Sequence, residues 1–128
     1  MKKTTRLFSL LLVLVLCLSA LPVSAAAAGT TGWVQQSNGT WKYLSNGVPL
    51  TNQWKQIDGY WYYFNEAGIR NSNGYSQIGG YWYYFNSDGR MHTGWKHITG
   101  TYNGQAYDYW TYFLSSGKEI GDGWQKIG

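Results

Sequence analysis

The stretch Tyr60-Trp61-Tyr62-Tyr63-Phe64 is aromatic at every position. Neighbouring side chains of an extended strand point to opposite faces of the sheet, so Trp61 and Tyr63 share one face and the other three rings share the second. A strand with one face in water would alternate apolar and polar residues. Both faces of this strand must therefore contact something. The stretch predicts a β-hairpin that stacks on a neighbouring repeat through one face and lines a groove with the other.

The same pattern recurs along the chain at intervals of about twenty residues. A leading Trp or Tyr occurs at four positions separated by 21, 21 and 20 residues: Trp33, Trp54, Tyr75 and Trp95. A second series opens the aromatic strands at intervals of 20, 21 and 28 residues: Trp41, Trp61, Trp82 and Trp110. Repeats of this length indicate an array of small units, each of which covers the apolar face of its neighbour.

Pairs that contain glycine divide each repeat into two strands. Three pairs lie between the leading aromatic residue and the aromatic strand, where a tight hairpin turn requires positive φ: Asn38-Gly39, Asp58-Gly59 and Gly79-Gly80. Four more turn the chain into the next repeat: Asn46-Gly47, Ala67-Gly68, Asp88-Gly89 and Ser116-Gly117. After residue 30, no segment has apolar residues at helical spacing. The sequence therefore predicts an all-β solenoid of stacked hairpins.

The fourth repeat is longer than the others. Trp95 and Trp110 are 15 residues apart, and the surplus residues 101–108 contain Asn103-Gly104. We expect this segment to form a longer hairpin loop. The chain then ends with the predicted first strand of a fifth repeat, residues 124–128, which lacks its partner strand. Two alternatives stay open: the chain self-associates through this incomplete hairpin, or the chain is a fragment of a longer repeat protein.

Residues 1–28 have the order of features typical of a secretory signal peptide. Three cationic residues precede an almost unbroken apolar run at 7–21, and small residues end it. This run is shorter than the ~20 residues of a spanning helix, which disfavours a membrane anchor. We expect a helical signal peptide in residues 1–28 that is cleaved between Ala25 and Ala28. The mature repeat domain, residues 29–128, is expected to be secreted and not membrane-bound.

Removal of this peptide changes the charge and the cysteine content. The peptide carries three of the ten Lys and Arg residues, so the remaining seven face six Asp and Glu residues, a net charge of about +1. No basic cluster remains that could neutralise a row of phosphates, so nucleic acid is not an expected partner. Cys17 leaves with the peptide, and packing without disulfides must hold the mature fold together.

The polar residues of the repeats do not form a catalytic or metal-binding pattern. Hydrolysis of a glycan requires two carboxylates on opposite sides of the scissile bond. The acidic residues here mostly lie beside turn glycines, where turn geometry explains them. His92 and His97 are single residues without metal-ligand or nucleophile spacing around them. We therefore expect a binding protein that is not an enzyme and that requires no cofactor or metal.

Residues 32–128 resemble the choline-binding, or cell-wall-binding, repeats of Gram-positive surface proteins. The resemblance rests on Gly32-Trp33 with Trp41-Lys42-Tyr43, on Trp61-Tyr62-Tyr63-Phe64-Asn65, on Trp82-Tyr83-Tyr84-Phe85-Asn86, and on Met91-His92-Thr93-Gly94-Trp95. It implies a left-handed β-solenoid with ligand sites between consecutive hairpins. It also implies that the partner is a cell-wall polymer, such as choline-bearing teichoic acid.

The resemblance further implies which residues bind the ligand. A cage in this family takes the leading aromatic residue, the first aromatic of the second strand, a ring from the next hairpin and an apolar lid. The first cage would contain Trp33, Trp41, Tyr62 and Leu50, and the second would contain Trp54, Trp61, Tyr83 and Ile69. The third would contain Tyr75, Trp82, Met91 and an aromatic residue of the fourth hairpin, where the candidates are Trp95 and Trp110.

Such cages suit a quaternary ammonium, which has no N–H to donate and is held by aromatic faces. Trp33, Trp54 and Trp61 are therefore expected to be partly exposed in grooves between hairpins. The rings expected in the core are Tyr63, Tyr84, Phe64 and Phe85. Loss of the Trp54 ring is expected to weaken binding at little cost in stability, whereas Trp61 is expected to serve both binding and stability.

Carbohydrate is the alternative ligand. Closely similar repeats occur in the glucan-binding domains of glucosyltransferases and in the receptor-binding repeats of clostridial toxins. A sugar would need polar side chains beside the stacking ring, and five are available: Gln35, Gln56, Asn65, Gln77 and Asn86. The sequence therefore leaves choline and glycan both open as ligands of the same aromatic repeats.

Overall fold

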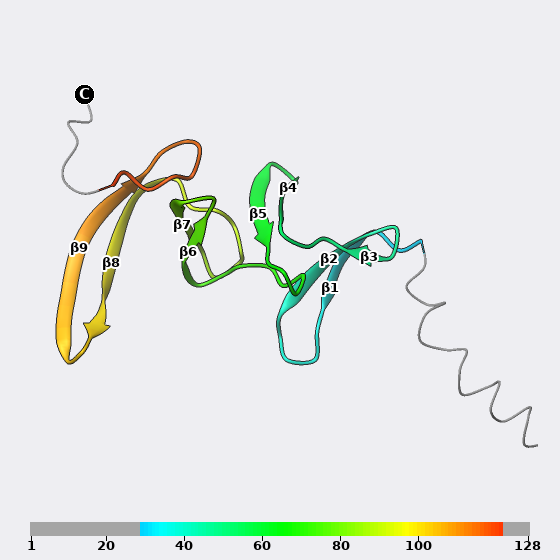
Figure 1. Ribbon diagram of the computed structural model, residues 1–128, viewed down its shortest axis with the longest axis horizontal. Helices are drawn as coiled ribbons and strands as arrows, with labels where there is room; N and C mark the ends of the chain where they lie inside the picture. Colours follow the sequence, from blue (N-terminus) through cyan, green and yellow to red (C-terminus); the bar gives the residue numbers. More distant parts are fainter. Residues whose placement is uncertain (1–28, 122–128) are drawn as a thin grey trace, which may run out of the picture.

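The computed structural model describes residues 29–121, which form nine β-strands and no helix. The first hairpin pairs β1 (Gly32–Gln35) with β2 (Trp41–Ser45), and the short strand β3 (Val48–Pro49) adds to β2. Three more hairpins follow: β4 (Gln53–Ile57) with β5 (Tyr60–Phe64), β6 (Gly74–Ile78) with β7 (Tyr81–Phe85), and β8 (Gly94–Tyr102) with β9 (Gln105–Phe113). They succeed one another in chain order along the long axis of the molecule (Figure 1), which confirms the all-β hairpin solenoid.

Two predicted segments lie outside the described residues. They are the signal peptide at 1–28 and the first strand of a fifth repeat at 124–128. Within residues 29–121, no helix is long and apolar enough to cross a membrane.

Two of the three predicted tight hairpin turns are confirmed, and the turn at Asn38-Gly39 is not a two-residue turn. Asp58 and Gly59 have φ values of 51° and 84°, and Gly79 and Gly80 have values of 59° and 84°. Positive φ at both central residues gives the turn the same twist as the strands it joins, which is why the register is unbroken from Gln53↔Phe64 to Ile57↔Tyr60. The turn at Asn38-Gly39 lies in a longer loop, which the Gln36 amide closes by donating to the Thr40 carbonyl over 2.8 Å.

The expected long loop in the fourth repeat is wrong. Strands β8 and β9 pair over nine residues each, from Gly94↔Phe113 to Tyr102↔Gln105, and only Asn103 and Gly104 form the turn. These two residues have φ values of 49° and 77°, the geometry of a tight hairpin turn. Because an Asn-Gly turn needs no further loop residues, the surplus segment lengthens both strands of the hairpin instead.

Backbone hydrogen bonds tie each connecting segment to two hairpins. The amides of Arg70, Met91 and Glu119 each donate over 2.8 Å to the carbonyl of the tryptophan in an earlier aromatic strand: Trp41, Trp61 and Trp82. The same three residues form isolated bridges with the last residue of the strand that precedes them: Phe64, Phe85 and Phe113. We call Arg70, Met91 and Glu119 the lid positions, because each one follows a connecting turn and closes the groove between two hairpins.

The core is a row of phenylalanines on one face of the hairpins. Phe64, Phe85 and Phe113 are 0% exposed, and Tyr62 and Tyr83 on the same face are buried with them. The expectation that Tyr63 and Tyr84 belong to the core is wrong, because both are only half-buried. They lie on the opposite, groove-lining face, beside Trp54 and Tyr75, where the next hairpin covers only part of each ring.

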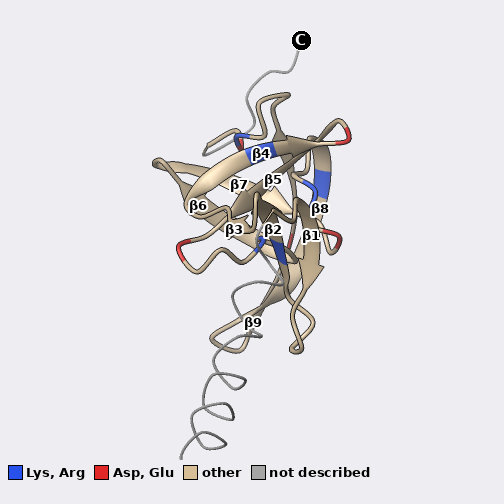
Figure 2. Ribbon diagram, turned by 90° about the vertical axis from the view of Figure 1, so that its right-hand side faces the viewer, with Lys and Arg blue, Asp and Glu red and all other residues tan. Residues whose placement is uncertain are grey.

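Charged residues are dispersed over the described part of the chain (Figure 2). Two cations lie on exposed tyrosines: Arg90 Cζ is 3.7 Å from the ring centroid of Tyr60, and Lys118 Nζ is 3.6 Å from that of Tyr81. Arg90 also forms an ion pair with Asp88, with 3.4 Å between Nε and Oδ2. Both partners are exposed, so this pair contributes little to stability.

Candidate functional site

Stacking between hairpins brings the leading aromatic residues onto the next hairpin. The Trp33 ring lies 4.9 Å from Tyr62 and 5.8 Å from Phe64, measured between ring centroids. One repeat later, the Trp54 ring lies 4.8 Å from Tyr83 and 5.7 Å from Phe85. Tilted and edge-on pairs at these distances are the favourable arrangements for aromatic rings. Three sites follow from this geometry, one at each junction between consecutive hairpins.

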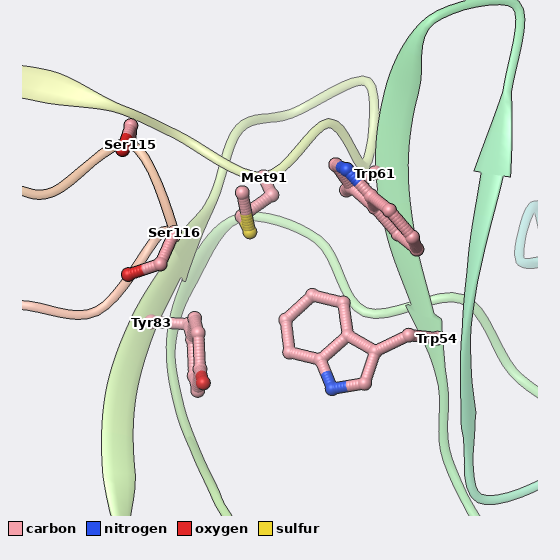
Figure 3. A pocket seen from close by; sticks show the side chains of 6 residues that line it. All are labelled: Trp54, Trp61, Tyr83, Met91, Ser115 and Ser116. Carbon is pink, nitrogen blue, oxygen red and sulfur yellow. The ribbon is translucent and has the colours of Figure 1, made fainter.

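The second site is an open cavity. It has a volume of about 400 Å³ and is lined by Trp54, Trp61, Tyr83, Met91, Ser115 and Ser116. Figure 3 shows Trp54 and Trp61 on one side of the cavity, Tyr83 and the two serines on the other, and Met91 between them. Its residues come from the second and third hairpins and from the segments that follow the third and fourth hairpins. A cavity of this size, with aromatic and thioether walls and no ionisable group other than a phenol, suits a small apolar cation.

The lids differ from those predicted. Met91, expected in the third cage, lines the second, and Ile69 does not line it. The reason is the hydrogen bond from the Met91 amide to the Trp61 carbonyl, which places the lid of a site after the following hairpin and not before it. The Ile69 amide is instead held at 2.9 Å by the side-chain oxygen of Asn65 within its connecting turn.

The first site brings together its three predicted rings. Trp33 and Trp41 are 6.3 Å apart, at right angles, and Tyr62 packs against Trp33. Leu50, the predicted lid, donates its amide to the Tyr43 carbonyl, and the lid position is taken by Arg70. The guanidinium carbon of Arg70 lies 5.6 Å from the Trp33 ring and 5.8 Å from the Trp41 ring, so a cation of the chain itself contacts both tryptophans.

The environment of Arg70 is partly apolar. Its Nε atom is buried and has no hydrogen-bond partner among residues 29–121. Burial lowers the pKa of Arg70 from its ordinary value, and the nearby Tyr62 and Asp88 oppose that effect. The side chain remains charged at neutral pH, since the pKa of arginine is far above 7. The first site is therefore an aromatic cage that holds an internal cation.

The third site has an aromatic residue at only two of the three positions that carry rings in the other sites. Tyr75 and Trp82 face each other at 6.1 Å, but Thr111 stands where Tyr62 and Tyr83 stand in the other sites. The lid is Glu119, whose Oε1 accepts hydrogen bonds from the Tyr75 hydroxyl at 2.7 Å and from Thr111 Oγ1 at 2.8 Å. Burial, followed by hydrogen bonds to Tyr109 and Glu119, raises the pKa of Tyr75.

The structure does not bring Trp95 and Trp110 to the third site. In the register of β8 and β9, they alternate with Thr111 and Phe113, which face the third hairpin, so they lie on the other face. Trp110 is 56% exposed, and His97 stacks on it at 4.8 Å with the rings nearly parallel. His97 Nε2 also lies 2.6 Å from Asp108 Oδ1.

Four residues of these sites were missed at the level of the sequence: Arg70, Glu119, Ser115 and Ser116. A signal for the lids was present. Each lid position lies two residues after the glycine of a connecting turn, as Gly68, Gly89 and Gly117 show. The two serines carry no comparable signal, because they belong to a turn that lies two hairpins after Trp54 in the chain.

The family model of the cell wall binding repeat matches residues 52–69 and 73–91, which contain the second and third hairpins. Among solved structures, choline binding protein F from Streptococcus pneumoniae is 33% identical over 77% of this chain and 30% of that protein, with a TM-score of 0.61. CbpJ from the same organism is 37% identical over 71% of this chain and 28% of its own, with a TM-score of 0.55.

A third structure, the choline binding domain of Spr1274 in Streptococcus pneumoniae, is 42% identical over 51% of this chain and 97% of that domain, with a TM-score of 0.46. The chain thus spans less than a third of the length of choline binding protein F and CbpJ, and nearly all of this shorter domain. No curated protein sequence matches the chain.

Proposed function

Because the chain belongs to the cell wall binding repeat family, we propose that it is a non-catalytic module that binds choline groups of a cell-wall polymer. The polymer of this proposal is a choline-bearing teichoic acid, and the choline-binding residues are those of the second site. Association with the cell surface accords with this family, and the signal peptide expected in residues 1–28 would supply export.

One observation carries the proposal, and it is the composition of the second cavity. Three rings and a thioether surround about 400 Å³, and the polar groups in its wall are two serine hydroxyls and the Tyr83 phenol. A trimethylammonium group has no hydrogen to donate, so a carboxylate cannot form a hydrogen bond with it, whereas aromatic faces attract its charge without one. The wall therefore matches choline better than it matches a primary amine.

The expected affinity is weak. Each ring that contacts a cation contributes ~0.5–2 kcal/mol, so three rings give a few kcal/mol, which corresponds to roughly millimolar dissociation constants. The first site holds Arg70 and the third contains Glu119, so one chain offers one open cage of this type in its described part. Tight attachment to a wall would then depend on several copies or further repeats acting together on a polymer with many choline groups.

The polar residues of the described part can be explained without a catalytic role. Within residues 29–121 no group of three or more His, Cys, Asp and Glu side chains could hold a metal ion. The nearest approach to a catalytic pair is His97 with Asp108, which lies exposed on the long fourth hairpin. Its histidine stacks on the Trp110 ring at 4.8 Å.

Calorimetric titration of the secreted chain with choline, and then with α-glucan and purified wall, tests the ligand. Choline at millimolar concentration should quench tryptophan fluorescence and raise the melting temperature, because a ligand that binds only the folded state stabilises it. If choline does neither while an α-glucan does both, the choline assignment is wrong.

Trp61→Ala and Trp82→Ala form a matched pair for locating the site. The two tryptophans occupy the same position in β5 and β7, and they are similarly exposed, at 42% and 47%. Trp61 lines the second cavity, whereas Trp82 belongs to the third site, which contains Glu119. Trp61→Ala should weaken choline binding, and Trp82→Ala should leave it within about twofold of the parent. Equal losses in both variants would contradict the assignment to the second site.

Carbohydrate remains a second candidate ligand, and the long fourth hairpin is the feature that favours it. Trp110 is 56% exposed, and the hydrogen-bonding side chains His97 and Asp108 stand beside it. A flat ring next to polar groups is the arrangement that a sugar requires. Trp110→Ala should abolish glucan binding under this alternative and leave choline binding intact.

Export is tested separately. N-terminal sequencing of the secreted protein should give a start between Ala26 and Gly29, because the small residues that follow the apolar run suit a signal peptidase. Secreted material that begins at Met1 would contradict the predicted cleavage.

A further inference from the structure

The three lid positions share one backbone geometry but carry different side chains. The amides of Arg70, Met91 and Glu119 each donate a hydrogen bond of 2.8 Å to a tryptophan carbonyl of the site that they close: Trp41, Trp61 and Trp82. A guanidinium, a thioether and a carboxylate therefore enter three grooves from the same direction. The walls of the first two grooves are alike, with two tryptophans and a tyrosine in each. The lid is consequently the main chemical difference between the first and second sites.

The Arg70 side chain occupies the part of the first groove that is open in the second. Its guanidinium carbon lies 5.6 and 5.8 Å from the ring centroids of Trp33 and Trp41, which are 6.3 Å apart, so the charge contacts both rings from one side. A methyl group built on Gly89 would collide with the Arg70 side chain, just as one built on Gly117 would collide with Met91. Both lid side chains thus lie against the glycine of the following turn. The longer arginine brings its charge to the two tryptophan rings.

Both the fit and the electrostatics disfavour a second cation in this groove. A quaternary ammonium between Trp33 and Trp41 would compete with the guanidinium for the same aromatic faces. It would also lie close to a like charge in a partly buried setting, where repulsion is stronger than in water. Asp88 belongs to the turn that follows β7, and its negative charge favours the charged form of Arg70.

We propose that Arg70 is a resident cation that closes the first cage to external quaternary ammonium ligands, and that the lid residue decides which cages of this chain are open. The inference rests on the proposed choline binding at the second site. It predicts that the ligand selectivity of the array can be changed at one position per repeat. An apolar lid leaves the cage available, and a guanidinium lid fills it.

Reciprocal substitutions test this rule. Arg70→Met gives the first site the lid of the second, and Met91→Arg gives the second site the lid of the first. Each site reports through its own tryptophan indole N–H signals in ¹H–¹⁵N spectra, which can be followed at millimolar choline concentrations. In the parent protein, choline should shift the signals of Trp54 and Trp61 and leave those of Trp33 and Trp41 in place.

The variants should change this pattern in opposite directions. Arg70→Met should add saturable shifts at Trp33 and Trp41, with a dissociation constant within about tenfold of the second site. Met91→Arg should remove the shifts at Trp54 and at Trp61. Lys118→Met is the matched control, because it also replaces a cation on an aromatic ring, Tyr81, but outside both cages. It should leave the parent pattern unchanged.

Each outcome bears on a separate claim. If choline shifts no tryptophan of the parent, the proposed function fails, whatever the role of Arg70. If the parent shows saturable shifts at Trp33 and Trp41, or if folded Arg70→Met shows none there, the closure by Arg70 is refuted while choline binding stands. Should Arg70→Met fail to fold, Met91→Arg decides alone: retained shifts at Trp54 and Trp61 would overturn the rule, and their loss would support it.

Discussion

Trp54 and Trp61 line the same cavity, but their surroundings predict opposite consequences when each is replaced by alanine. The Trp54 ring packs against three others, at 5.2 Å from Tyr63, 4.8 Å from Tyr83 and 5.7 Å from Phe85. Trp61 is 42% exposed and takes part in no ring pair within residues 29–121. The sequence predicted that loss of the Trp54 ring would cost less stability than loss of the Trp61 ring. The contacts in the structure predict the reverse.

The magnitude of the Trp54 effect follows from its contacts. Three aromatic pairs at ~0.5–1.5 kcal/mol each give ~1.5–4.5 kcal/mol, and burial of a large ring in a core gives a similar ~3–5 kcal/mol on truncation. Because Trp54 is only half-buried, we expect Trp54→Ala to lower the free energy of unfolding by about 3 kcal/mol. At ~4–8 °C per kcal/mol for a domain of this size, the melting temperature should fall by roughly 12–24 °C.

Trp61→Ala should show the opposite balance. Its cost in the free energy of unfolding should stay below about 1 kcal/mol, because the ring is largely exposed and its backbone hydrogen bond is kept. Loss of one cation–π contact of ~0.5–2 kcal/mol should weaken choline binding by about 2- to 30-fold. Urea denaturation and calorimetric titration of the two variants measure both quantities. The reasoning is refuted if Trp61→Ala destabilises the protein as much as Trp54→Ala does.

Four further substitutions test other parts of the structure. Phe85→Ala removes a ring that is 0% exposed and should lower the free energy of unfolding by about 3–5 kcal/mol in urea denaturation. Gly59→Ala and Gly117→Ala both place a side chain at positive φ, at a cost of ~1–2 kcal/mol, but only Gly117→Ala also collides with Met91, so only it should weaken choline binding in a titration. The pKa of Tyr75 is raised in the folded state, so the unfolded chain releases this proton first as the pH rises above 10. The stability that the protonated Tyr75 contributes is therefore fully present below pH 10 and is lost as the pH rises above it. Tyr75→Phe removes this titration, so the melting temperature of the variant should fall less between pH 10 and 11.5 than that of the parent.

The hairpins and their turns could be predicted because their signals are local. A pair such as Asp58-Gly59 adopts positive φ at both positions wherever it occurs, and it sets the strand register on either side. The same rule applied to Asn103-Gly104 would have given the long strands β8 and β9 correctly. The predicted loop followed from the length of the insertion, but the Asn103-Gly104 pair decides how many residues form the turn.

The composition of the sites could be predicted only in part. The pairs Trp33 with Trp41 and Trp54 with Trp61 follow from the register within one hairpin, and the family resemblance added Tyr62 and Tyr83. The lids were assigned one repeat too early. They depend on a hydrogen bond between a connecting segment and an earlier hairpin, such as Met91 to Trp61, which strand periodicity does not contain.

By itself, the sequence determined the all-β class, the repeat length and the face on which each ring lies, because alternation and turn geometry act between residues close in the chain. The tertiary structure alone decided which groove is open. Arg70, Met91 and Glu119 stand at equivalent positions, and only the stacking of successive hairpins brings each of them to the rings of an earlier repeat. Whether a cage can hold an external cation depends on that long-range packing, because it decides whether a charge of the chain already occupies the aromatic faces.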